Sequence, residues 1–288
     1  MRVDIQVKKA APEFVARGIR FPLDSKVLIM GVLNITPDSF SDGGHFLDPG
    51  KAFEHVQRMT EEGADIIDIG GESTRPGAVP VDEEEEIRRL KPLLQRLGRC
   101  NPVPISVDTR KAAVAQLALD FGAVMVNDIS ALQSDRGMSR VVAEAKAGLV
   151  LMHMQGDPQT MQQAPSYGDV IGEIKHFLAD RLSAAGDDGI PSQNILLDPG
   201  IGFGKNASHN LTIINRLDQL LNLGRPIIVG VSKKSFIGQI LEKPVDSRSI
   251  GTATAVAIAI LRGAHLVRVH DVGLTRDVAK MARLISEA

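Results

Sequence analysis

Short apolar runs of strand length alternate along the chain with amphipathic stretches of helix length. Each run is continuous and rich in Val, Ile or Leu, which is typical of a parallel strand buried on both faces. The runs lie at 27–33, 64–70, 104–108, 124–128, 149–153, 194–198, 227–232 and 265–269. The helical stretches between and after them include 82–97, 110–121, 136–147, 206–223 and 273–286. Eight strand–helix units in about 260 residues predict an α/β fold, a (β/α)8 TIM barrel with a parallel eight-stranded sheet.

The first 26 residues lie outside this repeat and form a short N-terminal extension. Within it, the stretch FVARGIRFP (14–22) is expected to form a hairpin that caps the barrel floor. No low-complexity tract or linker interrupts the chain, so 1–288 is predicted to be a single domain. The N-terminus lacks the apolar run of a signal peptide, and the longest nearly apolar stretch, 253–261, is too short to span a bilayer. We therefore expect a cytoplasmic protein.

The composition excludes several classes of partner. Lys and Arg number 33 against 35 Asp and Glu, a net charge of -2, which gives no basic surface for nucleic acid or for anionic membranes. Aromatic residues are only 3%, too few to build stacking platforms for bases. The single cysteine, Cys100, cannot form an internal disulfide or a multi-thiolate metal site.

Two local patterns have simpler explanations than the functions they suggest. The acidic run 82–86 is interpreted as the first turn of a helix, where carboxylates complement the helix dipole. The stretch GIGFGKN (200–206) fails as a P-loop because Pro199 and Asn206 occupy positions that need Gly and Ser or Thr. It also lacks the acidic residue that a dinucleotide fingerprint requires about twenty positions later.

Polar residues follow nearly every strand at its carboxyl end, the rim on which barrels of this type carry their chemistry. A lone Asp after a strand is often only a helix cap, but polar groups on the same rim must pair with each other or with a ligand. Two carboxylates, an amide and an ammonium suit a flat heterocycle with several ring nitrogens. This set comprises Asp108, Asn127, Asp198 and Lys234.

A second group comes from strands one, two and eight, which become neighbours when the barrel closes. It is cationic and binds oxygen, as expected around a phosphate or pyrophosphate with Mg²⁺. Its members are Asn34, Arg75, Arg268 and His270. The chain has no Ser–His–Asp spacing, no HExxH motif and no thiolate nucleophile. Together these features predict a transferase that displaces pyrophosphate from a heterocyclic substrate, with two long loops, TPDSFSDGG and ESTRPGAVP, able to close over it.

Eight motifs spread over residues 27 to 288 resemble the dihydropteroate synthase family. They are GVLNITPDSFSDGG (31–44), IDIGGESTRPGA (67–78), SVDT (106–109), NDI (127–129), LMHMQG (151–156), LDPGIGFGKN (197–206), SKKSFIG (232–238) and RVHDV (268–272). The resemblance implies the joining of (7,8-dihydropterin-6-yl)methyl diphosphate to 4-aminobenzoate, giving 7,8-dihydropteroate and pyrophosphate in folate synthesis. It also implies sulfonamides as competitors of aminobenzoate, and a homodimer.

The resemblance further implies a role for each matching residue. Pterin diphosphate would contact Thr74, Asp108, Asn127, Met152, Asp198, Lys234, Arg268 and His270. Aminobenzoate would contact Thr74, Pro76, Phe203 and Ser235, and Asn34 would hold Mg²⁺. The catalytic set would be Asp108, Arg75, Lys234, Arg268 and His270. One departure is Lys233, where the family often has Arg; Lys keeps the charge but loses the planar fork of donors.

Two other readings of the same barrel stay open at this point. A methyltetrahydrofolate-binding methyltransferase resembles the same pterin pocket, but would not need the STRPG loop or the pair Arg268 and His270. A non-catalytic pterin-binding protein would not need both loop motifs. Helix 245–261, rich in Ala and Ile, belongs either to the core or to a dimer face.

Overall fold

The structure, a computed structural model, describes residues 12–36, 48–75, 77–100 and 103–288. Its main sheet has eight parallel strands in the order β8-β7-β6-β5-β4-β3-β10-β9. They are β3 (Leu28–Asn34), β4 (Ile66–Gly70), β5 (Ile105–Asp108), β6 (Met125–Asp128), β7 (Gly148–Met152), β8 (Ile195–Asp198), β9 (Ile228–Val229) and β10 (Leu266–Val269). A bridge between Leu197 and Ile227 joins the two edge strands, so the sheet closes into the predicted barrel. Each strand falls within or one residue beyond its predicted run.

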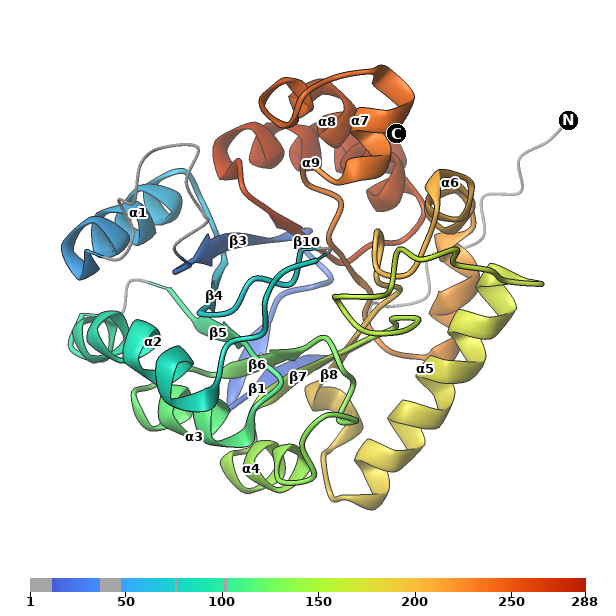
Figure 1. Cartoon of the computed structure of the whole chain (residues 1–288). Helices are drawn as coiled ribbons and strands as arrows, with labels where there is room; N and C mark the ends of the chain where they lie inside the picture. The colour runs from blue at the N-terminus through green and yellow to red at the C-terminus, as the bar shows by residue number, and fades with distance from the viewer. Residues whose placement is uncertain (1–11, 37–47, 76, 101–102) are drawn as a thin grey trace, which may run out of the picture.

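Helices surround the barrel on the outside (Figure 1). They are α1 (Pro49–Glu61), α2 (Glu83–Leu97), α3 (Ala112–Asp120), α4 (Met138–Ala145), α5 (Val170–Asp187), α6 (Ala207–Asn215), α7 (Ser235–Leu241), α8 (Ser249–Leu261) and α9 (Val272–Glu287). Short 3-10 helices are η2 (Ser192–Asn194), η3 (Leu217–Leu223) and η4 (Val245–Ser247). Among the described residues, no helix combines the length and the apolar character needed to cross a bilayer.

Successive side chains along each strand point alternately outward, toward the helices, and inward, into the barrel interior. In β4, Ile67 and Ile69 point outward and join the large core beneath the helices. Ile66 points inward and belongs to a second apolar cluster that fills the lower barrel. Asp68, two residues further along the same face, is fully buried in the barrel interior. The interior is therefore apolar at the bottom and polar toward the carboxyl ends of the strands.

The N-terminal hairpin caps the barrel floor, as the sequence predicted. Strands β1 (Phe14–Ala16) and β2 (Ile19–Phe21) pair antiparallel, and Phe14 and Phe21 join the apolar cluster of the lower barrel. The contact is close at Gly148, where an added Cβ would lie 2.9 Å from both Phe14 and Ala16. The hairpin thus covers apolar strand ends that water would otherwise reach.

Three predicted elements differ from the observed ones. The helix predicted over 245–261 begins only at Ser249, because η4 and Arg248 occupy its first residues. The run 227–232 forms a ladder only over Ile228–Val229, because the chain leaves the sheet at Gly230 and turns through Lys233, which has a left-handed φ of 56°. The helix predicted over 206–223 divides into α6 and η3 at Arg216, whose φ of -116° interrupts the α-helical geometry. The acidic run does open a helix: Asp82 caps α2 by accepting a hydrogen bond from the Glu85 amide at 2.8 Å.

Candidate active site

A pocket opens at the carboxyl ends of the barrel strands, where sequence reasoning placed the site. Its side walls come from the ends of β5, β6, β7, β8 and β10 and from the loops that follow β4, β8 and β9. It is lined by Thr74, Asp108, Asn127, Ile129, Met152, Asp198, Ile201, Phe203, Gly230, Lys234 and Arg268. The structure therefore brings together most of the residues assigned to the pterin, with Phe203 from the aminobenzoate group beside them.

A network of charged side chains forms the base of this pocket. Arg268 donates through Nε to Asp68 Oδ2 at 2.6 Å and through Nη2 to Asp108 Oδ2 at 2.7 Å. Asn127 Nδ2 donates to the same Asp68 oxygen at 3.0 Å. Sequence reasoning missed Asp68. The available signal was a charged residue in the middle of the buried run IIDIG, a position where an unpaired carboxylate is very costly.

One guanidinium between two buried carboxylates sets the protonation of this network. Burial raises the pKa of Asp108 to about 7, Arg268 opposes that shift, and the negative charge of Asp68 adds to it. Burial disfavours the charge on Arg268, but Asp68 and Asp108 outweigh burial and hold its pKa above the ordinary value. Arg268 is therefore a permanent cation, whereas Asp108 titrates near neutral pH.

Another part of the pocket lining carries a second carboxylate and a lysine, Asp198 and Lys234. Asp198 accepts a hydrogen bond from the Gly200 amide at 2.7 Å, and burial raises its pKa. Lys234 lies 4.1 Å from the centroid of the Phe203 ring. Burial and the nearby Arg268 lower the pKa of Lys234 to about 8, although Asp198 and Asp108 oppose the shift. Lys234 is thus a cation held over an aromatic face, in a site that weakens its hold on the proton.

Behind this part of the pocket lining, Lys205 supports the loop that carries Phe203. Its buried Nζ donates to the carbonyl oxygens of Phe203 at 2.9 Å and His153 at 3.2 Å, and lies 2.9 Å from His153 Nδ1. Burial and the Lys205 charge lower the pKa of His153 to about 3, so the imidazole is neutral and its Nδ1 accepts. His153, which ends the fifth predicted strand, therefore faces Lys205 rather than the pocket.

Two glycines allow this loop to pack backbone against backbone. Gly200 has a φ of 68°, and an added Cβ would lie 1.9 Å from the His153 carbonyl oxygen. At Gly204, with a φ of 63°, an added Cβ would lie 2.4 Å from the Gln155 carbonyl oxygen. Glycine is needed at both positions because the backbone is left-handed and two loops approach closely there. These glycines therefore do not require a phosphate-binding function to explain them.

Positive charge gathers on the rim next to the pocket. His270 contacts Ser232 in the loop that follows β9. Its Nδ1 lies 3.0 Å from Ser232 Oγ, and its backbone amide donates to the same oxygen at 3.2 Å. Desolvation of the ring lowers the pKa of His270 to about 3, and the positive charges of Arg268, Lys233, Arg75 and Lys234 lower it further. His270 is exposed on this rim, beside these cationic side chains.

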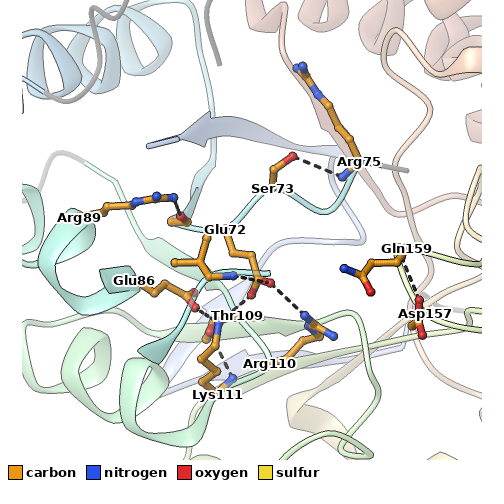
Figure 2. A network of polar contacts seen from close by, with 12 residues as sticks. Glu72, Ser73, Arg75, Glu86, Arg89, Thr109, Arg110, Lys111, Asp157 and Gln159 are labelled. Carbon is orange, nitrogen blue, oxygen red and sulfur yellow. Dashed lines mark hydrogen bonds and ion pairs between the residues drawn. The ribbon is translucent and has the colours of Figure 1, made fainter. Parts of the chain in front are cut away.

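Ion pairs fix the base of the loop that follows β4 (Figure 2). Glu72 accepts from Arg110 Nη2 at 3.0 Å and from Lys111 Nζ at 2.7 Å, and Lys111 also pairs with the buried Glu86. Further along, the Gly77 amide donates to the Pro158 carbonyl at 3.2 Å. Arg75, on the same loop, extends away from Glu72 in Figure 2 and is exposed. The base of the loop is therefore held by ion pairs, whereas the Arg75 side chain, which was assigned to the anion, is exposed.

Among the remaining assigned residues, Asn34 and Ser235 are described and do not line the pocket. Asn34 ends β3, is half-buried, and has its Oδ1 3.5 Å from the point that a Cβ on Gly70 would occupy. Ser235 begins α7 and is exposed, outside the pocket lining. Pro76 and most of the loop 35–44 lie outside the described residues.

Comparison with known proteins gives one consistent result. A family model described as "Pterin binding enzyme" matches residues 30–270. The dihydropteroate synthase of Synechocystis sp. is 46% identical over 263 residues, 91% of each chain. That of Escherichia coli K12 is 44% identical over 253 residues, 88% of this chain and 89% of the other.

Solved structures agree with these relatives. The Yersinia pestis dihydropteroate synthase, determined in a complex with a sulfonamide drug, superposes with a TM-score of 0.92 at 42% identity and covers 96% of this chain and 100% of its own. The Xanthomonas albilineans dihydropteroate synthase with 4-aminobenzoic acid gives a TM-score of 0.89 at 41% identity, covering 96% and 99%. Similarity at this level, over about nine tenths of each chain, shows that the chain belongs to the dihydropteroate synthase family.

Proposed function

We propose that this synthase holds the dihydropterin ring in the pocket between Asp108 and Lys234 and joins it there to 4-aminobenzoate, releasing pyrophosphate. The observation that carries the proposal is the convergence of Asp108, Asn127, Asp198, Lys234 and Arg268 from separate strands on one narrow pocket. Carboxylate, amide and ammonium groups match the alternating donors and acceptors of a pterin edge. Met152 and Ile201 supply apolar contact for the ring.

The diphosphate would lie on the cationic rim beside the pocket. Arg75 and Lys233 carry positive charge there, Arg268 adds its charge from the base of the pocket, and His270 offers a ring nitrogen as a further hydrogen-bonding group. Thr74 lines the pocket below this rim and would contact both substrates. Lys233 lacks the fork of an Arg, so it would act as a point charge.

The rim also fits a magnesium ion. Mg²⁺ is usually held by one or two protein oxygens together with substrate phosphates and water, so the side-chain amide oxygen of Asn34, a half-buried residue at the end of β3, is a suitable donor. When bound, the ion would neutralise charge on the diphosphate.

Aminobenzoate would approach from the side of Phe203 and Thr74, with Ser235 at the outer edge. Pro76, the fourth residue assigned to it, lies outside the described residues. Phe203 is buried against Lys234, and its loop is tied to the strand below by Lys205. The Xanthomonas albilineans relative is described with 4-aminobenzoic acid and the Yersinia pestis relative with a sulfonamide drug. We infer the same pair of competing ligands for this chain.

The reaction depends on electrostatic stabilisation of the leaving pyrophosphate and of the pterin cation rather than on a general base. The bond between the pterin methylene carbon and the diphosphate oxygen breaks, and its electron pair leaves with pyrophosphate. Arg75, Arg268 and the rim stabilise that charge, while an ionised Asp108 offsets the cation left on the pterin. The arylamine nitrogen then forms the new C–N bond and loses one proton to water.

A pyrophosphate-release assay with both substrates tests this function. We expect turnover that depends on the pterin diphosphate and on aminobenzoate, and a loss of about a hundredfold or more in pterin affinity for Asp198→Ala, because the pterin edge would lose a buried charged partner. A methyltransferase or a non-catalytic binding protein would bind the pterin without releasing pyrophosphate, which would refute the proposal.

We also propose that the chain forms a homodimer through α8 and α9. These neighbouring helices expose apolar side chains at helical spacing, among them Ile250, Ile258 and Leu261 on α8 and Met281 and Ile285 on α9. An exposed apolar surface of this kind favours association with a second copy. Sedimentation analysis should give a dimer for the natural chain and a monomer for Met281→Glu combined with Ile285→Glu.

A further inference from the structure

Asp68 lies beneath the proposed pterin pocket and is fully buried, so it cannot itself touch a substrate. It does not line the pocket, but its Oδ2 accepts hydrogen bonds from two residues that do, Arg268 at 2.6 Å and Asn127 at 3.0 Å. One oxygen atom therefore links two groups that arrive from opposite sides of the barrel, on β10 and on β6. Any effect of Asp68 on substrate must act through them.

The bond to Asn127 has a consequence for hydrogen-bond polarity. An ionised carboxylate only accepts, so the Asn127 side chain must turn its NH2 group toward Asp68 and keep its carbonyl oxygen for the pocket. The flipped amide would place two oxygens against each other in a buried site, and Asp68 Oδ2 would keep only the hydrogen bond from Arg268. Asn127 is thus presented to a ligand as an acceptor.

The bond to Arg268 fixes the plane of the guanidinium. Nε is engaged by Asp68 and Nη2 by Asp108, so two separate carboxylates hold the fork from two directions. A planar donor set that is anchored at two points keeps its orientation without help from substrate.

We propose that Asp68 is a positioning residue that sets the acceptor polarity of Asn127 and the plane of Arg268 before the pterin enters. The proposal rests on the proposed contacts of Asn127 and Arg268 with the pterin. Asp68, a residue outside the pocket, would thus make the pocket select a ligand that presents a ring N–H donor to Asn127.

Substitutions at Asp68 test the proposal by calorimetry with 6-hydroxymethylpterin. Asp68→Ala removes the acceptor and should weaken binding by about tenfold to a hundredfold. Asp68→Asn keeps an oxygen that can accept both hydrogen bonds, so its affinity should stay within about threefold of the natural chain. The matched control is Ser106→Ala, since Ser106 is the buried cross-strand neighbour of Asp68 and has no hydrogen-bond partner in the described structure. It should leave affinity unchanged.

A double-mutant cycle separates positioning from a general loss of structure. Asn127→Ala should weaken binding strongly in the natural chain and much less in Asp68→Ala, because Asn127 is already misoriented there. Additive losses, or an Asp68→Ala affinity within threefold of the natural chain, would overturn the inference while leaving the pterin site intact. If Asn127→Ala itself binds normally, the proposed pterin contact is wrong and the inference with it.

A measurement on the natural chain does not depend on the folding of any variant. With Asn-selective ¹⁵N labelling, the Asn127 side-chain NH2 signal is identified by its loss in Asn127→Ala. We expect this signal to be resolved before ligand is added and to show no scalar coupling through a hydrogen bond to a pterin nitrogen afterwards, because the NH2 group donates to Asp68. Such a coupling would contradict the inferred polarity.

Discussion

The ammonium of Lys234 lies 4.1 Å from the centroid of the Phe203 ring, although the two residues come from different loops. Phe203 follows β8, and Lys234 is the residue just before α7, in the loop after β9. The contact joins the residue proposed for the pterin edge to the one proposed for aminobenzoate. A change on one side should therefore be measurable on the other.

Phe203→Leu should move the alkaline limb of the pH profile. Burial lowers the pKa of Lys234 to about 8, so the cation is lost as pH rises through that value. Removing the aromatic face removes a stabilisation of the charged form of about 0.5–2 kcal/mol, equivalent to a further pKa decrease of up to about 1.5. The limb of kcat/KM should therefore shift to lower pH. Phe177→Leu, an aromatic substitution against His153, is the matched control and should leave the limb in place.

The acidic limb of the same profile should report Asp108. Its pKa is raised to about 7 by burial, so the free enzyme gains a proton there as pH falls below neutral. If ionised Asp108 offsets charge on the pterin, kcat/KM should fall about tenfold per pH unit below that value. Asp108→Asn should lose about a hundredfold or more in activity and show only the titration of the substrate itself. A full acid limb in this variant would exclude Asp108 as its source.

Lys111→Met should destabilise the fold far more than the loss of an exposed cation. Lys111 neutralises two carboxylates, Glu72 and the fully buried Glu86, so its removal leaves uncompensated buried charge. We expect a loss of about 3–5 kcal/mol in the free energy of unfolding, measured with urea. Arg88→Ala, which breaks an exposed pair with Glu85, should cost less than about 1 kcal/mol. Similar losses of unfolding free energy in both variants would refute the conclusion that Lys111 stabilises the fold by neutralising buried carboxylates.

Pyrophosphate should leave before the amine attacks. The electron-rich dihydropterin can delocalise a methylene cation, and the rim already stabilises the departing charge. The enzyme should therefore release pyrophosphate slowly from the pterin diphosphate alone, with water capture giving hydroxymethyl-dihydropterin. Strict dependence of bond cleavage on aminobenzoate, with no positional isotope exchange in the diphosphate, would favour direct displacement instead.

The sequence by itself determined the barrel and the rim on which its chemistry lies. Parallel strands buried on both faces read as continuous apolar runs, and their polar ends must meet at one edge of the closed sheet. For that reason Asp108, Asn127, Asp198 and Lys234 could be grouped before any coordinates. The single-domain organisation stays a prediction, which one cooperative unfolding transition would support.

Only the tertiary structure decided which polar residues face the pocket and which support it. His153 ends a strand as Asp198 does, yet it turns to Lys205, and Asp68 lies inside a run that reads as apolar, yet it orients Arg268. Glu86, in an acidic run that was interpreted only as the first turn of a helix, is buried against Lys111. These outcomes depend on contacts between residues 25 to 200 positions apart. The spacing of residues along the sequence predicts which strand face or helix end a residue occupies. The partner of a buried charge depends instead on which strands and helices come together when the barrel closes.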